Sequence, residues 1–305
     1  MKNLINHFYH IYPDKIYKKH DIYYFYINDS KFYFLEFNRD LTDLPVLVEL
    51  TNVLYEKGIK VHTFIKNIKE EFYASFDRKN YILLRTNIEE NIEVDLIDIV
   101  KFNNLLASDS NLLYKNEWKT RWMNQVDKFE AQVMEYNDEY PIMRSCFDYY
   151  IGLAENAISY LKNIELETEE DKKLYLCHKR ISSPITYGTL YNPLNFMFDN
   201  KTRDLAEYVK TKFFNGIFNE EEIEKILIRN NYAFSVNDAS LFYARLLYPT
   251  YYFDFFEKVI NGEILEEKFE KFINLSQNFE SLLLELYVFL KSRYNIEPID
   301  WLVNK

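Results

Sequence analysis

The hydrophobic pattern of this 305-residue chain changes its period about a third of the way along. Before residue 88, apolar and aromatic residues gather in short runs such as IYYFYI (Ile22–Ile27) and KFYFLEF (Lys31–Phe37), which predict β-strands. Later they recur at helical spacing, as Trp118 and Trp122 do. This change predicts a small β-rich part followed by a larger helical part.

Turn residues divide the first part into hairpins. The polar triplets Asn28–Ser30 and Asp77–Lys79 each separate two predicted strands. Between the two hairpins, a leucine-rich segment that ends at Gly58 predicts one helix. We therefore predict a β-rich N-terminal lobe with one helix over residues 1–87, and a helical C-terminal lobe over residues 88–305.

Composition excludes several classes of protein. A net charge of −11 argues against a non-specific nucleic-acid binder, which needs an excess of Lys and Arg. No apolar run is long enough to predict a membrane span, and no signal peptide is apparent at the N-terminus. The two cysteines, Cys146 and Cys177, lack the spacing of a zinc site and predict buried thiols.

Aromatic residues are abundant, with 27 Tyr and 25 Phe. Two interpretations stay open. The bias follows from an AT-rich genome, or the tyrosines serve adhesive contacts and oxidative cross-linking at the surface.

Two later segments carry a family resemblance. LCHKRISSP (Leu176–Pro184) resembles the LCHGD loop of aminoglycoside-phosphotransferase and CotS-like kinases. NFMFDNKTRDLAEYVK (Asn195–Lys210) resembles the metal-binding segment that follows, in the form that the YutH group of spore coat proteins has. The resemblance extends from about Ile22 to about Ile260. It implies an α+β, bilobal protein-kinase-like fold of the aminoglycoside-phosphotransferase type, with a small β-rich N-lobe and a large helical C-lobe.

The predicted N-lobe lacks the groups that such kinases use to bind a nucleotide. Phosphoryl transfer depends on a backbone cradle for the phosphates and on a Lys paired with a Glu. The first glycine of the chain is Gly58, so the opening hairpin has none. By the resemblance, Glu36 takes the Lys position and Glu49 the Glu position. Two carboxylates there would repel a triphosphate.

The catalytic loop is changed as well. When His178 is aligned with the family His, Arg180 takes the place of the catalytic Asp, and a guanidinium cannot act as a base. Ile185 takes the place of the metal-binding Asn and has no side-chain oxygen. Asp199 is the best remaining metal candidate and Asp204 the second. We expect His178 to support the loop, and Arg180 to pair with one of the two aspartates.

These substitutions predict a non-catalytic pseudokinase, with no cofactor expected. The resemblance implies a structural or interaction component of the spore coat in an endospore-forming bacterium. Such a protein would be made in the mother-cell cytoplasm, assembled into the coat, and bound by other spore coat proteins.

Two alternatives stay open. The first is an active small-molecule or protein phosphotransferase that uses Mg-ATP through Asp199 and Asp204. The second is a pseudokinase that senses a nucleotide without turnover. The discriminating observation is whether these carboxylates face an open polar cleft or are paired with Arg180 and Arg203.

Overall fold

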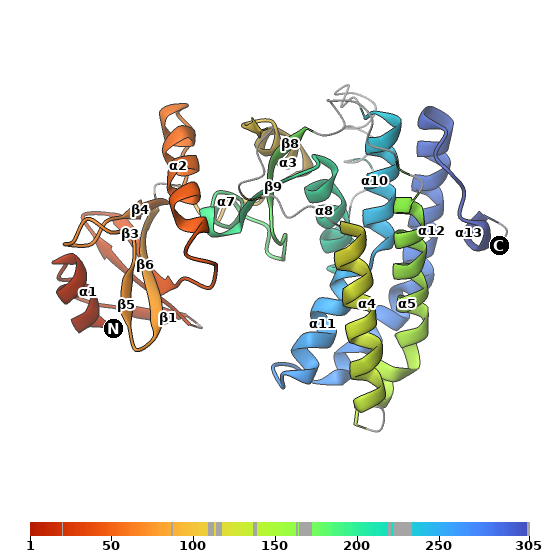
Figure 1. Cartoon of the computed structure of the whole chain (residues 1–305), viewed down its shortest axis with the longest axis horizontal. Helices are drawn as coiled ribbons and strands as arrows, with labels where there is room; N and C mark the ends of the chain where they lie inside the picture. The colour runs from red at the N-terminus through yellow and green to blue at the C-terminus, as the bar shows by residue number, and fades with distance from the viewer. Residues whose placement is uncertain are drawn as a thin grey trace. The chain divides into compact units, whose positions relative to one another are not determined.

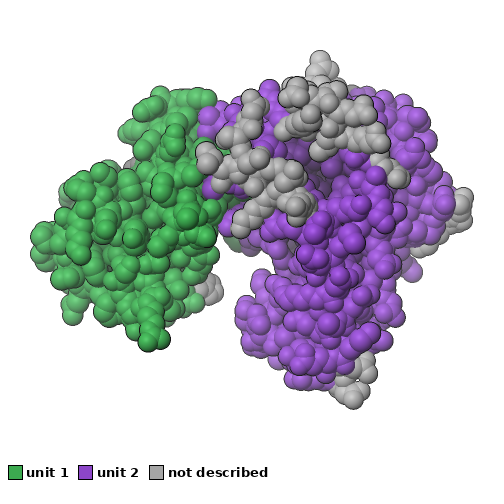
Figure 2. All heavy atoms as spheres, in the orientation of Figure 1, with its two compact units in different colours: residues 1–94, 184–198 green, residues 95–183, 199–305 purple. Residues whose placement is uncertain are grey.

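A computed structural model describes residues 1–19, 21–86, 88–108, 113, 118–136, 139–162, 164, 173–218, 221 and 234–303 (Figure 1). The chain forms two compact units, coloured separately in Figure 2. The first comprises Met1–Val94 and Pro184–Phe198, and the second comprises Asp95–Ser183 and Asp199–Lys305. The predicted division at residue 87 is therefore corrected. The first unit continues to Val94 and includes a later segment, because backbone hydrogen bonds join that segment to the linker at residues 88–94.

The first unit is built on an antiparallel sheet with strand order β1-β2-β3-β6-β4, and β5 pairs with β6. Its strands are β1 (Tyr17–Lys19), β2 (Ile22–Ile27), β3 (Ser30–Glu36), β4 (Thr63–Ile65), β5 (Ala74–Phe76) and β6 (Lys79–Thr86). Its helices are α1 (Lys2–Tyr9), α2 (Asp43–Glu56), α7 (Tyr187–Leu190) and the 3₁₀ turn η1 (Pro193–Asn195).

Both predicted hairpins are present. Asn28 and Asp29 join β2 to β3 with φ angles of 46° and 62°. Asp77 and Arg78 join β5 to β6 with φ angles of 49° and 60°. Two-residue turns with positive φ at both positions match the twist of antiparallel strands, which is why they form tight hairpins.

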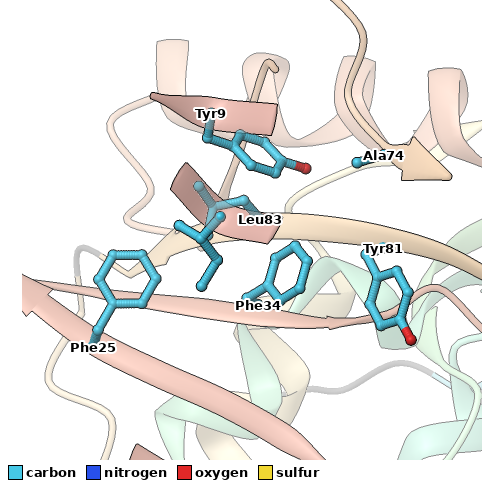
Figure 3. Close-up of a cluster of buried hydrophobic side chains, with 7 residues drawn as sticks. Tyr9, Phe25, Phe34, Ala74, Tyr81 and Leu83 are labelled. Carbon is cyan, nitrogen blue, oxygen red and sulfur yellow. The ribbon is translucent and has the colours of Figure 1, made fainter. Parts of the chain in front are cut away.

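One face of the sheet carries an apolar core that α1 helps to cover. Phe25, Phe34 and Leu83 project from β2, β3 and β6 into a cluster that includes Ile5 and Tyr9 of α1 (Figure 3). Helix α1 is a correction to the prediction of one helix in this part of the chain. Its apolar residues are four apart, so they form one stripe that the sheet can bury.

The predicted leucine-rich helix is α2. Its buried face includes Leu44, Leu47, Val48 and Leu54, and it packs against β4. Gly58 follows its C-terminus with a φ of 78°, a conformation that glycine adopts without strain.

The second unit is mainly helical, as its sequence pattern predicts. Helix α10 packs against α5, α8 and α12 in its interior (Figure 1). The helices and 3₁₀ turn of this unit are α3 (Leu96–Asn103), α4 (Trp118–Glu135), α5 (Pro141–Lys162), α8 (Thr202–Phe214), α10 (Val236–Leu247), α11 (Thr250–Ile260), η3 (Glu266–Phe269), α12 (Glu270–Tyr294) and α13 (Asp300–Val303).

Aromatic rings fill much of the space between these helices. Phe129 of α4 stacks on Phe253 of α11 with ring centroids 4.4 Å apart, and Tyr150 of α5 stacks on Tyr252 at 4.1 Å. Stacked aromatic pairs of this kind contribute about 0.5–1.5 kcal/mol beyond their buried area. A large share of the aromatic residues thus serves the core.

Three short strands position the candidate site. β7 (Ala107–Ser108) pairs antiparallel with β8 (Leu174–His178), and β9 (Phe196–Asp199) leads back into the second unit. All five residues of β8 are buried. Among the described residues, no helix is both long and apolar enough to cross a membrane.

The core under α1 gives a direct test of this packing. Phe34 is 0% exposed, and we expect Phe34→Ala to lower the free energy of unfolding of the first unit by about 3–5 kcal/mol. Phe76, on β5 of the same sheet, is 49% exposed, so Phe76→Ala is the matched control, with a loss below about 1 kcal/mol. Hydrogen exchange of the β2, β3 and β6 amides in increasing urea would measure both. Equal losses would contradict the placement of Phe34 in the core.

Candidate functional site

His178 ends β8 and is held in place by Asp204, in the first turn of α8. The Asp204 carboxylate accepts a hydrogen bond from the His178 backbone N–H (3.0 Å) and lies 2.7 Å from the ring Nδ1. Asn103 Nδ2 donates to the same carboxylate at 3.2 Å. Asp204 is 0% exposed, so its oxygens join β8, α3 and α8 instead of facing solvent.

Asp199, at the end of β9, is surrounded by cationic donors. Arg203 Nη1 donates to Oδ2 at 2.9 Å, and Arg245 Nη2 lies 3.1 Å from both oxygens. The indole Nε1–H of Trp118 donates to Oδ1 at 3.0 Å. The aspartate is 1% exposed. Both oxygens that could bind a metal are thus used within the protein.

Trp118 also covers the two arginines. Its ring lies 4.1 Å from the Arg245 guanidinium carbon and 4.5 Å from that of Arg203. Arg203 in turn donates from Nε to the His178 carbonyl at 2.7 Å and from Nη2 to the Lys179 carbonyl at 2.9 Å. Guanidinium–aromatic contacts gain strength when water is excluded, as it is here. The network ties the backbone of the loop after β8 to Asp199.

Arg180 is not part of this network, which corrects the expected pairing. Its guanidinium forms an ion pair with Asp254 of α11 at 2.8 Å, and the Arg180 side chain is 51% exposed. The arginines that pair with Asp199 are Arg203 and Arg245. Arg203 is four residues after Asp199 and lies in the first turn of α8, whereas Arg180 belongs to the loop that leaves β8.

A buried lysine completes the charged interior of the second unit. Four oxygens lie within hydrogen-bond distance of Lys210 Nζ, from Glu207 (2.8 Å), Thr250 (2.9 Å) and the backbone carbonyls of Arg245 and Tyr248 (2.7 and 2.9 Å). Burial alone would raise the pKa of the Glu207 carboxyl, but the Lys210 ammonium holds it below its usual value. Burial lowers the pKa of the Lys210 ammonium, although Glu207 opposes this change. The two groups form a buried pair.

The other candidate residues lie in the first unit. Glu36 forms an ion pair with Lys79 at 2.7 Å, on the neighbouring strand β6. Glu49 lies on the exposed face of α2, and Ile185 is buried. Glu36 therefore has a cationic partner, Lys79, within the same sheet.

The first unit holds a different lysine–glutamate pair. Lys31 of β3 donates to Glu90 at 2.7 Å, and its ammonium lies over the rings of Tyr24 (5.1 Å) and Tyr33 (4.6 Å). Burial would lower the pKa of Lys31, but the bonds to Glu90 and Tyr33 raise it above its usual value. The pair borders a hollow of about 580 Å³ that is lined by Tyr26, Asp29, Ser30, Lys31, Lys60, Thr86, Ile88, Glu89, Glu90 and Asn91.

Metal ligands do not converge in the part of the chain that the structure describes. No group of three or more His, Cys, Asp or Glu side chains there could hold a metal ion.

The sequence did not predict two of the residues that enclose Asp199, which are Trp118 and Arg245. Arg245 gives a usable signal in retrospect, since it interrupts the apolar run LFYARLLY of α10. A charged residue within such a run is rarely buried without a partner of opposite charge.

Known proteins agree with this architecture and with the sequence motifs. A family model described as "Spore coat putative kinase YutH" matches residues 2–286. This chain belongs to the YutH family. Endospore coat-associated protein YutH of Bacillus subtilis (strain 168) is 28% identical over 201 residues, which span 54% of this chain and 57% of that protein.

Solved structures show that this YutH-family chain has the aminoglycoside phosphotransferase-like kinase fold. An aminoglycoside phosphotransferase from Alicyclobacillus acidocaldarius superposes with a TM-score of 0.71 at 9% identity, covering 93% of this chain and 94% of that one. Spectinomycin phosphotransferase APH(9)-Ia, in complex with ADP and spectinomycin, gives 0.61 at 12% identity, covering 90% and 92%. The fold is α+β, with an antiparallel N-terminal sheet and a helical C-terminal part.

The enclosure of Asp199 predicts a large effect of removing one arginine. We expect Arg245→Leu to lower the free energy of unfolding by about 3–5 kcal/mol, because a buried carboxylate loses part of its compensation. Arg180→Ala removes a half-exposed ion pair in the same unit and should lose at most about 1 kcal/mol. All three tryptophans lie in the second unit, so urea unfolding followed by tryptophan fluorescence measures both. A loss below 1 kcal/mol for Arg245→Leu would show that Asp199 is not held as described.

Proposed function

We propose that this chain is a non-catalytic member of the YutH family, a pseudokinase that serves as a structural or interaction component of the spore coat. The observation that carries the proposal is the enclosure of Asp199 by Arg203, Arg245 and Trp118. In kinases of this fold, the corresponding carboxylate has to be open to Mg²⁺ and the nucleotide phosphates.

Charge compensation makes this enclosure hard to open. Two guanidiniums already neutralise the single carboxylate, and Mg²⁺ prefers several oxygen ligands together with its own water molecules. A metal ion would have to displace both arginines, leaving them buried beside a divalent cation. Such unpaired buried charges are strongly unfavourable.

The position of the catalytic base supports the same proposal. By the resemblance to the LCHGD loop of aminoglycoside-phosphotransferase kinases, Arg180 takes the position of the catalytic Asp, and an arginine stays protonated at any pH at which a protein is folded. Its guanidinium is directed to Asp254 of α11. The residue therefore has no means of accepting a proton from a substrate hydroxyl.

The hollow in the first unit has few cationic groups that could bind a triphosphate. Lys31 is already paired with Glu90. The hollow beside it holds three carboxylates, of Asp29, Glu89 and Glu90, against the two ammonium groups of Lys31 and Lys60. The surplus of negative charge would repel phosphate groups.

The proposed role in the coat rests on the family and on the surface. The family model and the Bacillus subtilis relative are both described as spore coat proteins. Large side chains suited to contact with partners are exposed, among them Tyr12, Tyr26 and Tyr55. We propose other spore coat proteins as partners, and a path from the mother-cell cytoplasm to the coat.

A thermal-shift measurement tests the loss of nucleotide binding. We expect no change in Tm with millimolar ATP or ADP, with or without Mg²⁺. A ligand at a hundred times its Kd would add about 2.7 kcal/mol of stability, which is a rise of several degrees. Spectinomycin phosphotransferase, whose structure was solved with ADP, is the positive control.

The two alternatives give different outcomes in the same measurement. A Mg²⁺-dependent rise in Tm would favour an active phosphotransferase, and turnover assays would follow. A rise that is independent of Mg²⁺ would favour a nucleotide-sensing pseudokinase. Either result would overturn the proposal that the chain works without a nucleotide.

A further inference from the structure

Residues 184–198, which we call the strap, are held against the rest of the first unit, residues 1–94, by a series of hydrogen bonds. The strap leaves the second unit after Ser183 and returns to it at Asp199. The strap donates from Tyr187 N–H to Ile92 C=O (2.9 Å) and from Gly188 N–H to Glu90 C=O (3.1 Å). It accepts from Val94 N–H at Ile185 C=O (3.0 Å) and from His62 N–H at Tyr191 C=O (3.3 Å). Glu93 and Thr186 form an antiparallel β-bridge in the same region.

Two side chains of the first unit complete the attachment. Arg39 donates from Nη1 to the carbonyls of Leu194 (3.1 Å) and Phe196 (2.8 Å), while its Nε is bonded to Asp43. His62 Nε2 lies 3.1 Å from the Gly188 carbonyl. Because a carbonyl only accepts, Nε2 must carry the proton in this contact.

Glycine is required where the strap meets the linker. A Cβ at position 188 would lie 2.9 Å from the Glu90 Cβ and 3.2 Å from its carbonyl oxygen. Any other residue would force the strap and the linker apart. The close approach also places Gly188 beside the carboxylate that pairs with Lys31.

His62 is the titratable group in this attachment. It is 2% exposed, and in the described part of the chain its Nδ1 has no hydrogen-bond partner. Around it lie Tyr33 of β3, whose ring meets the imidazole edge-on at 6.0 Å, and the charged pair of Lys31 and Glu90. Proton uptake would place a buried N–H donor at Nδ1 without an acceptor, close to the Lys31 ammonium.

We propose that residues 184–198 form a pH-sensitive strap, which is latched to the first unit when His62 is neutral and released when His62 is protonated. The two states differ in whether the linker carbonyls of Glu90 and Ile92 are bonded to the strap or open to other partners. The proposal does not depend on the absence of catalysis, because it rests on contacts within the first unit.

The direction of the pH effect follows from the burial of His62. Burial lowers the pKa of the imidazole below its ordinary value of 6.5. The bond to the Gly188 carbonyl and the Glu90 carboxylate oppose this only in part. A released strap exposes His62, which then protonates with its ordinary pKa. Acidification from about pH 7.5 to about pH 5.5 therefore raises the released population, by up to about tenfold when the latched state takes up no proton.

Hydrogen exchange of the full-length protein, followed by mass spectrometry, tests this. With exchange times scaled for intrinsic chemistry, we expect peptides of residues 184–198 to lose protection at the lower pH, by up to about tenfold. His62→Gln keeps a donor to the Gly188 carbonyl but cannot titrate, so its strap should respond little to pH. His7→Gln, at an exposed histidine of α1, is the matched control and should respond like the wild type.

Two outcomes would overturn the proposal. The first is that hydrogen-exchange protection of the strap in the wild type does not change with pH. The second is that the strap of His62→Gln responds to pH as strongly as that of the wild type. If His62→Gln does not fold, an NMR titration of the ¹³C-labelled histidine ring signals in the wild type tests the proposal instead. The His62 midpoint must then lie below 6.5 and coincide with the loss of strap protection. Gly188→Ala, which separates strap and linker sterically, should show low strap protection at both pH values.

Discussion

The second unit depends on one buried carboxylate and the two guanidiniums that neutralise it. Asp199 lies at the end of β9, Arg203 in the first turn of α8, and Arg245 on α10. A charge at this depth is tolerated only with close compensation, so the three elements that supply these groups are fixed relative to one another. Arg203 extends the constraint to β8 through the His178 carbonyl. Asp199 and its two arginines thus act as an internal support of the second unit.

Asp204 and Arg203, which lie in the first turn of α8, also fix the shape of the loop after β8. Asp204 holds the His178 backbone and ring, and Arg203 holds the carbonyls of His178 and Lys179. The side chain of Arg180 is then directed outward to Asp254. The residues that hold the shape of this loop are different from those that would take part in a reaction, so the loop can keep its shape without reactive groups.

Prediction from the sequence succeeded best for features that depend on residues adjacent in the chain. Asn28 and Asp29 predicted a tight turn because both tolerate positive φ, and Gly58 predicted the end of α2 for the same reason. The replacements at Arg180 and Ile185 were visible because a motif fixes each position. Partners distant in sequence were not visible. Periodicity shows that Arg245 lies in an apolar run, but not that it meets Asp199, and nothing near residue 188 indicates that the strap joins the first unit. Such contacts depend on packing across elements, which one sequence does not encode in any short window.

The strap also affects the order in which the chain can fold during synthesis. The first unit ends its continuous part at Val94 but is complete only when Phe198 is available. At about 5–20 residues per second, the ribosome needs on the order of 5–20 s to add the intervening chain. During that interval the emerging sheet and α2 have to exist with the carbonyls of Glu90 and Ile92 open to solvent. A fragment that stops at the end of the first sheet would preserve this incomplete state, so the unit has to be studied in a chain that reaches beyond residue 198.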